Sequence, residues 1–451
     1  MTQPKPRLDA QEFIEHVVAS GLLDREEVQR AVESLPPTDR ARLVARHLVE
    51  TGKLTKFQAE RLLGGKTDGF QLGQYRILDE LGRGGMGRVY KAVHLAMGRF
   101  VALKMISPAL TQTERARELF QREVRAAGRL HHPNIVTFYD AHTTGDRCYL
   151  VMEFVDGPNL SQLVREQGPL PVEQACEYIR QAALGLEYAH AQGLIHRDIK
   201  PSNLLVQQTT TGPQVKMLDF GLSLASTGDV PAAGQVPNTV LGTPDYVSPD
   251  QIRNQHEVDG RSDLYSLGCT FYYLLTGEPP FPGGTPLEKV IRHQQDAPVS
   301  VQTRRPDVPE AVAAIVHKLL AKNPKWRYQK AGELATELAA VVGKKADWSA
   351  PPLPRPKPRR ERHKEPADAS SSPSRTPDED LFGDSELGDR SSSTLPTAMI
   401  STRETQMAGP RRPRDRKNKP IWPWVVVAVI VAFGLVTAVA FLARFIIGRV
   451  G

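Results

Sequence analysis

The chain has 451 residues, a formal net charge of +7, 40% hydrophobic residues and three cysteines. This length allows two or three domains with an enzyme-sized core. The small net charge gives no reason to expect nucleic-acid binding, and the scattered cysteines argue against a disulfide framework or a Cys-x-x-Cys metal pair. No signal peptide is expected, because the N-terminus has no apolar core.

Residues 8–65 are predicted to form a small helical unit. Three segments have the spacing of a helix capping box: Asp9 with Glu12, Asp24 with Glu27, and Thr55 with Gln58. One apolar face is expected from Phe13, Ile14, Val17, Val18, Leu22 and Leu23. Because some 58 residues make only a small core, we expect this unit to lean on its neighbour.

Residues 81–90, LGRGGMGRVY, place glycines at Gly82, Gly84 and Gly87. Two unrelated nucleotide sites share this spacing. In a dinucleotide-binding fold the glycines turn a strand into a helix, whereas in a kinase they turn one strand into another over the phosphates of ATP. The third interpretation is a flexible turn without function. Strands are predicted at residues 75–78, 88–92 and 100–104, and helices at 173–191 and 262–276.

Phosphoryl transfer needs groups that hold the phosphates, and the segments after the glycines offer them. Lys104 ends an apolar strand and would point to the same face as Ala102, where it can grip phosphates. A buried lysine requires a carboxylate partner, and Glu123 on a predicted helix is the candidate. Taken alone, Glu123 would be an ordinary surface residue.

The segment His196-Arg-Asp-Ile-Lys-Pro-Ser-Asn carries the strongest local pattern. Asp198 is a candidate proton acceptor, Lys200 can offset charge on a γ-phosphate, and Asn203 can ligate a metal ion. Asp219, in Asp-Phe-Gly, follows an apolar strand, and its carboxylate suits Mg²⁺. The alternative for the segment that begins at His196 is a polar loop without function, and the alternative for Asp-Phe-Gly is an ordinary turn.

With these motifs in order, residues 75–342 resemble the eukaryotic-like serine/threonine protein kinases of bacteria. The resemblance implies an α+β, bilobal fold with a β-rich small lobe and an α-rich large lobe. It also implies ATP and Mg²⁺ as cofactors, with Mn²⁺ as an alternative, and a Lys104–Glu123 pair in the active state. Met152 would be the gatekeeper residue. The ATP site would comprise Leu81, Gly82, Gly84, Gly87, Val89, Ala102, Lys104, Glu153, Val155 and Leu205.

The same resemblance assigns the catalytic base to Asp198 and the metal ligands to Asn203 and Asp219, and Lys200 indicates serine/threonine specificity. Thr243 would bond toward Asp198 and Lys200. Asp263 would orient the catalytic loop. Arg327 would pair with the end of the activation segment, where Asp250 stands in place of the usual glutamate. This shorter side chain predicts either a small shift or a weaker pair.

Arg197, beside Asp198, requires an anion when the enzyme is ordered. A phosphate on the activation segment would supply one, and Thr239 is the first choice of site. The N-terminal unit and the residues after it contain Gly21-Leu-Leu, Leu48-Val-Glu-Thr-Gly-Lys-Leu-Thr-Lys-Phe-Gln-Ala and Leu72-Gly-Gln-Tyr. On these residues the unit resembles the segment before the kinase domain in many planctomycete kinases. It would be either a helical cap on the small lobe or a partner-binding module.

Residues 345–420 are rich in Pro, Ser, Arg and Asp and are predicted to be a disordered linker. Residues 421–443 carry no charge and are long enough to span a bilayer, with Trp422 and Trp424 at one interface. A buried core helix is the alternative. The basic run before residue 421 predicts contact with anionic lipid and a cytoplasmic kinase domain, which leaves residues 444–451 as a short extracytoplasmic tail.

These features together predict a single-pass kinase of the cytoplasmic membrane that phosphorylates proteins. Self-association on the membrane would promote autophosphorylation in trans. A pseudokinase scaffold is the alternative from another class. A dinucleotide oxidoreductase is more distant, because residues 88–91 favour a strand after the glycines rather than a helix.

Overall fold

The computed structural model describes residues 8–84, 87–108, 114–144, 147–220, 244–254 and 258–343. All of them belong to one compact unit. The predicted linker, membrane span and tail lie outside the described residues, as do Thr239 and Thr243.

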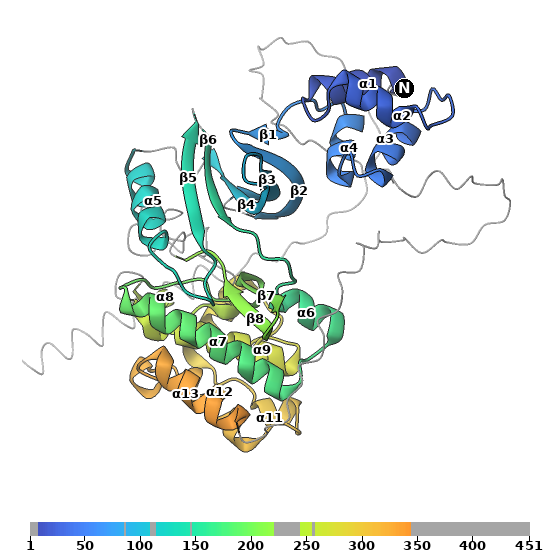
Figure 1. Ribbon diagram of the computed structural model, residues 1–451. Helices are drawn as coiled ribbons and strands as arrows, with labels where there is room; N and C mark the ends of the chain where they lie inside the picture. The colour runs from blue at the N-terminus through green and yellow to red at the C-terminus, as the bar shows by residue number, and fades with distance from the viewer. Residues whose placement is uncertain are drawn as a thin grey trace, which may run out of the picture. The chain divides into compact units, whose positions relative to one another are not determined.

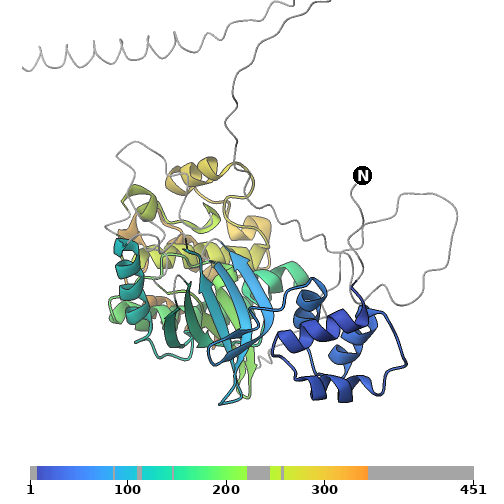
Figure 2. The same ribbon diagram turned by 90° about the horizontal axis from the view of Figure 1, so that it is seen from above.

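The first part of the chain is a four-helix unit with its own core, seen as a separate group in Figure 2. All three predicted capping boxes are present, because each N-cap oxygen accepts from the main-chain N–H three residues on and each N3 side chain accepts in return. The core extends past the predicted boundary at residue 65 to include Phe70. The helices are α1 (Ala10–Ala19), α2 (Arg25–Val32), α3 (Ala41–Glu50) and α4 (Lys56–Leu63).

The small lobe is a six-stranded antiparallel sheet with the order β1-β2-β3-β4-β6-β5 and with α5 beside it (Figure 1). The three predicted strands are confirmed as β2, β3 and β4. A two-residue strand, β1, precedes the predicted domain start at 75 and borders β2. The bounds are β1 (Gln71–Leu72), β2 (Tyr75–Gly84), β3 (Gly87–His94), β4 (Arg99–Ile106), α5 (Glu114–Ala127), β5 (Phe138–Thr144) and β6 (Arg147–Glu153).

The large lobe is helical and is built around α7 and α9, which pack on each other and on neighbouring helices (Figure 1). Helix α9 is buried around its whole circumference, as expected of a helix in the lobe's centre. Its ends are defined by the Asp259 N-cap and by Gly277 in the left-handed region.

Both predicted large-lobe helices are confirmed within two residues, as α7 and α9. The helices are α6 (Leu160–Gln167), α7 (Val172–Ala191), α8 (Pro249–Arg253), α9 (Gly260–Thr276), α10 (Pro286–Gln295), α11 (Val301–Arg304), α12 (Glu310–Leu319) and α13 (Ala331–Val342). The short elements are β7 (Leu204–Thr209), β8 (Gly212–Met217) and the 3-10 turns Pro201–Asn203, Pro244–Tyr246 and Pro324–Trp326.

After the four-helix unit, the sheet of the small lobe precedes the helices of the large lobe, so the α+β class and the bilobal fold are confirmed. Within the described ranges, no helix has the length and apolar character needed to cross a bilayer.

Candidate active site

The glycine-rich segment connects two antiparallel strands, β2 and β3, whose register brings Gly84 opposite Gly87. This arrangement excludes the dinucleotide-binding interpretation, which needs a helix after the glycines. Gly87 has φ +137°, and a Cβ there would lie 1.8 Å from the Met105 carbonyl oxygen. A Cβ on Gly82 or Gly84 would meet nothing within 4 Å. The main chain at Gly82 and Gly84 is therefore open to a ligand, with no side chain of its own in the way.

The predicted adenine-binding side chains gather in one apolar cluster of the small lobe. Ala102 lies opposite Met152 across β4 and β6, and both are buried. Val155 is buried in the same cluster, against which Val89 and Leu205 pack. The predicted contact Leu81 differs: it sits at a β-bulge of β2 and is 48% exposed.

Lys104 is buried, and its Nζ lies 2.7 Å from Oδ1 of Asp219. Burial alone would raise the pKa of Asp219, but the charge and hydrogen bond of Lys104 outweigh it and lower the pKa below its usual range. Asp219 is therefore ionised and suited to bind a cation. The predicted Lys104–Glu123 pair stays a prediction.

Asp198, Lys200 and Asn203 converge, as the resemblance implies. Nζ of Lys200 lies 2.7 Å from Oδ2 of Asp198. The amide nitrogen of Asn203 donates to the same oxygen at 3.1 Å and to the Asp198 main-chain carbonyl at 2.8 Å. Two donors from the same short segment thus fix the orientation of the Asp198 carboxylate.

The main chain before Asp198 is held by Asp263, a buried residue of α9. Its two carboxylate oxygens accept from the main-chain N–H groups of His196 and Arg197, each at 2.8 Å. His190 contacts the carboxylate through Nε2 at 2.8 Å. Burial by itself would raise the pKa of Asp263, but the hydrogen bond and charge of His190 outweigh it, so the pKa is lowered. Arg197 has φ +67°, a strained conformation that these bonds maintain.

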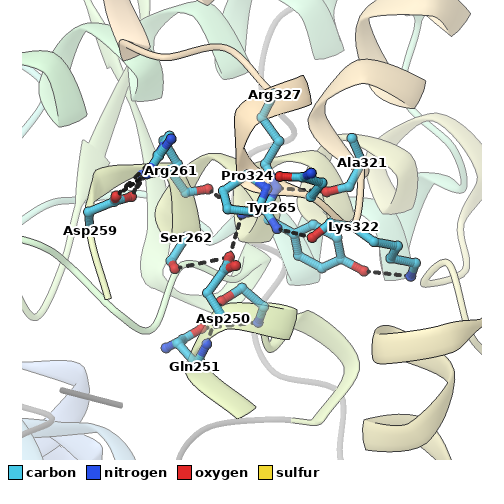
Figure 3. Close-up of polar contacts among 12 residues, drawn as sticks. Asp250, Gln251, Asp259, Arg261, Ser262, Tyr265, Ala321, Lys322, Pro324 and Arg327 are labelled. Carbon is cyan, nitrogen blue, oxygen red and sulfur yellow. Dashed lines mark hydrogen bonds and ion pairs between the residues drawn. The ribbon is translucent and has the colours of Figure 1, made fainter. Parts of the chain in front are cut away.

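Asp250 and Arg327 form the predicted ion pair, at 2.5 Å between Oδ2 and Nη1 (Figure 3). The shorter aspartate therefore reaches its partner. The Arg327 side chain is fully buried, and it also donates to the carbonyls of Arg261, Ala321 and Lys322. The pair anchors α8, at the end of the activation segment, to the large lobe.

Two contacts that position the site were not predicted from the sequence. Gln251, in α8, donates its side-chain amide to the Arg197 carbonyl at 2.7 Å. Lys216, in β8, pairs with Glu153 at 2.8 Å and ties the strand that leads to Asp219 to the predicted hinge. The spacing of Ser248 and Gln251 indicates a capping box, but no sequence pattern predicts the bond from Gln251 to a residue 54 positions away.

The donor set fits MgATP. Asp219 and Asn203 offer oxygen ligands, which Mg²⁺ prefers, and phosphates usually complete its coordination. Among the described residues no three His, Cys, Asp or Glu side chains gather as a self-sufficient metal site. A metal held here would therefore depend on a ligand such as a nucleotide for further coordination.

The family described as "Protein kinase domain" matches residues 75–338. Serine/threonine-protein kinase PknB of Mycobacterium leprae is 40% identical over 272 residues, which are 59% of this chain and 43% of that protein. PknB of Mycolicibacterium smegmatis is 41% identical over 276 residues, with the same shares. The chain thus spans less than half the length of these curated relatives.

The crystal structure of the Mycobacterium tuberculosis PknI kinase domain is 28% identical. It covers 60% of this chain and 97% of its own, with a TM-score of 0.46.

Proposed function

This chain belongs to the protein kinase family, and we propose that it is a membrane-tethered serine/threonine kinase. It transfers the γ-phosphoryl group of MgATP to serine or threonine hydroxyls of proteins. The observation that carries this proposal is the convergence of Lys200 and Asn203 on the Asp198 carboxylate. The bacterial serine/threonine kinases to which the chain is similar support the substrate class.

Each residue of the site has a role in binding or orientation. Asp198 accepts the proton of the acceptor hydroxyl and aims its oxygen at phosphorus. Lys104 and Lys200 would bring positive charge to the phosphates of a bound nucleotide, and Asn203 and Asp219 would hold the metal. Mg²⁺ supplies charge neutralisation on the phosphates when bound. Catalysis therefore rests on positioning and electrostatics.

A pseudokinase scaffold is the alternative, and the site gives it no support. Asp198, Asn203, Asp219 and Lys104 are all present. Asp198 has its orienting bonds, and Lys104 is paired with an ionised Asp219. A scaffold would have no need of a carboxylate oriented in this way.

Phosphorylation of the activation segment is proposed to switch the kinase on, with Thr239 as the first site. Arg197 supports this, because its Nε is buried and has no hydrogen-bond partner among the residues that the structure describes. A phosphate oxygen would satisfy that donor and offset its charge. The strained Arg197 main chain lies next to Asp198, so this anion would stabilise the base.

The membrane part of the proposal comes from the sequence. Residues 421–443 form an uncharged apolar stretch, preceded by a basic run that favours a cytoplasmic kinase domain. Anchored in this way, copies of the chain would phosphorylate one another in trans on the membrane surface.

The test compares wild type, Asp198→Asn and Thr239→Ala in labelled-ATP transfer and in phosphosite mapping by mass spectrometry. Asp198→Asn should lose more than about a hundredfold in transfer rate, because the proton acceptor is removed. Transfer at the wild-type rate by Asp198→Asn would refute the kinase mechanism. Full activity of Thr239→Ala without loop phosphate would refute activation through this segment.

A further inference from the structure

The capping box that begins α4 also bonds to the small lobe. Within the box, the Gln58 N–H donates to Thr55 Oγ1 at 3.2 Å, and Gln58 Oε1 accepts from the Thr55 N–H at 2.9 Å. Beyond the box, Thr55 Oγ1 donates to the Leu78 carbonyl at 2.6 Å and Gln58 Nε2 donates to the Ile77 carbonyl at 2.7 Å. One helix end thus supplies two donors to consecutive carbonyls of β2.

The residue types match this second task. The boxes of α1 and α2 have glutamate at the third helical position, Glu12 and Glu27. An ionised glutamate can only accept hydrogen bonds, whereas the glutamine amide both accepts and donates. Gln58 is only 3% exposed, so its amide would be unsatisfied without the Ile77 carbonyl. The glutamine is required by the contact with β2 rather than by the box.

Strand β2 needs these donors at this place. Ile77 pairs with Ala92 and Asp79 pairs with Lys91, which leaves Leu78 as an extra residue in a β-bulge. On the other side, β1 pairs only with Tyr75 and Arg76. The carbonyls of Ile77 and Leu78 therefore lie just beyond the end of the β1 ladder, and the N-terminal end of α4 supplies their hydrogen-bond donors.

Apolar contact supports the same docking. Phe57, between the two donors in sequence, packs against the small-lobe cluster that contains Tyr75, Ile77 and Tyr90. Its ring lies 6.1 Å from that of Tyr90, centroid to centroid. Tyr90 belongs to β3, the strand that leaves the glycine segment. Helix α4 thus contacts both strands that enter and leave the loop between Gly82 and Gly87.

We propose that α4 positions the glycine loop, so that the N-terminal unit acts as a built-in activator of nucleotide binding. This inference rests on the proposed kinase function. Leu78 precedes Gly82 by four residues. A shift of β2 at the bulge therefore moves the loop whose N–H groups approach the phosphates. Thr55 and Gln58 act through the strand rather than by touching ATP, which makes them positioning residues.

Gln58→Glu in the full chain is the sharpest test. Glutamate keeps the acceptor that completes the capping box, but it loses the donor to Ile77 and places a carboxylate against that carbonyl. The Kd for MgATP from titration calorimetry and the KM for ATP should both rise about fivefold or more, as expected for a modest coupling between sites. The kcat should stay within about twofold, because the Asp198 region is untouched.

Matched controls isolate the contact. Gln29→Glu adds the same charge to an exposed position of α2 in the same unit, and Gln162→Glu makes the same change at the same box position of α6, where the side chain is exposed. Both should bind MgATP as wild type does. Thr55→Ser, which keeps cap and donor, should also match wild type.

Thr55→Asp is the second variant, because aspartate caps a helix as Asp24 does but cannot donate to Leu78. It should weaken MgATP binding even if Gln58→Glu fails to fold. Unchanged Kd in these variants, with or without a lower melting temperature, would overturn the inference and leave the kinase function intact. A wild-type chain that neither binds MgATP nor transfers phosphate would overturn the proposed function itself.

Discussion

At the scale of single residues, the fully buried Arg327 makes the large lobe depend on Asp250. The guanidinium donates hydrogen bonds to main-chain carbonyls (Figure 3), but Asp250 is the partner that carries the opposite charge. Removing one member of a buried pair leaves a charge without compensation, which destabilises more than the pair itself contributes. The stability of α8, and with it the end of the activation segment, is therefore sensitive to this carboxylate.

Asp250→Ala should lower the free energy of unfolding by about 3 kcal/mol. Asp250→Glu should change it by less than about 1 kcal/mol, because the ion pair already closes and the extra methylene brings no new contact. Chemical denaturation monitored by circular dichroism would measure both. Asp307→Ala is the control, since the Asp307 side chain is itself exposed and its ion pair with the partly buried Arg305 is worth about 1 kcal/mol or less. A clear gain of stability in Asp250→Glu would instead show that the aspartate strains the pair.

At the scale of elements, capping boxes serve two purposes in this fold. The side chain of Gln251 completes the box of α8 by accepting from the Ser248 N–H at 3.0 Å. It also donates to the carbonyl of Arg197, the residue before Asp198. Gln58 does the same for β2. In both cases the glutamine that completes the capping box also makes a tertiary contact, because its amide can accept one hydrogen bond and donate another.

Gln251→Glu should therefore lower kcat by roughly tenfold to a hundredfold, because even a small displacement of the catalytic base slows the transfer step strongly. The KM for ATP should stay within about twofold, in contrast to Gln58→Glu. Steady-state kinetics with a casein substrate would show this split, and Gln162→Glu is again the control. Equal effects of both substitutions on kcat and KM would mean that the two boxes only stabilise the fold.

Sequence patterns predicted the helices and strands better than the contacts between them. The capping boxes were predictable because their partners lie three residues apart, and the strands followed from alternation. The meeting of Lys104 with Asp219 was not predictable, because the two residues lie far apart in the sequence and only the fold brings their side chains together. The Gln251 bond to Arg197 likewise depends on the path of the activation segment, which no local pattern specifies.

At the scale of the whole molecule, the proposed membrane tethering would set the concentration at which copies of the chain meet. The full chain in liposomes of anionic lipid should autophosphorylate at least about tenfold faster than a chain ending at residue 345 at equal bulk concentration. Phosphate incorporation over time measures this, with the same two chains in detergent as the control. Equal rates with and without liposomes would contradict activation by membrane clustering.

The two-residue strand β1 has a consequence for where this protein can be divided. Sequence similarity to kinases begins at Tyr75, yet the folded unit begins earlier, with α4 and β1 against β2. A fragment starting at Tyr75 would present the full length of an outer strand, together with the apolar ring contacts left by Phe57. Exposed edges of this kind pair readily with other chains. Such a fragment would therefore be prone to self-association, and its behaviour in solution would misrepresent that of the 451-residue chain.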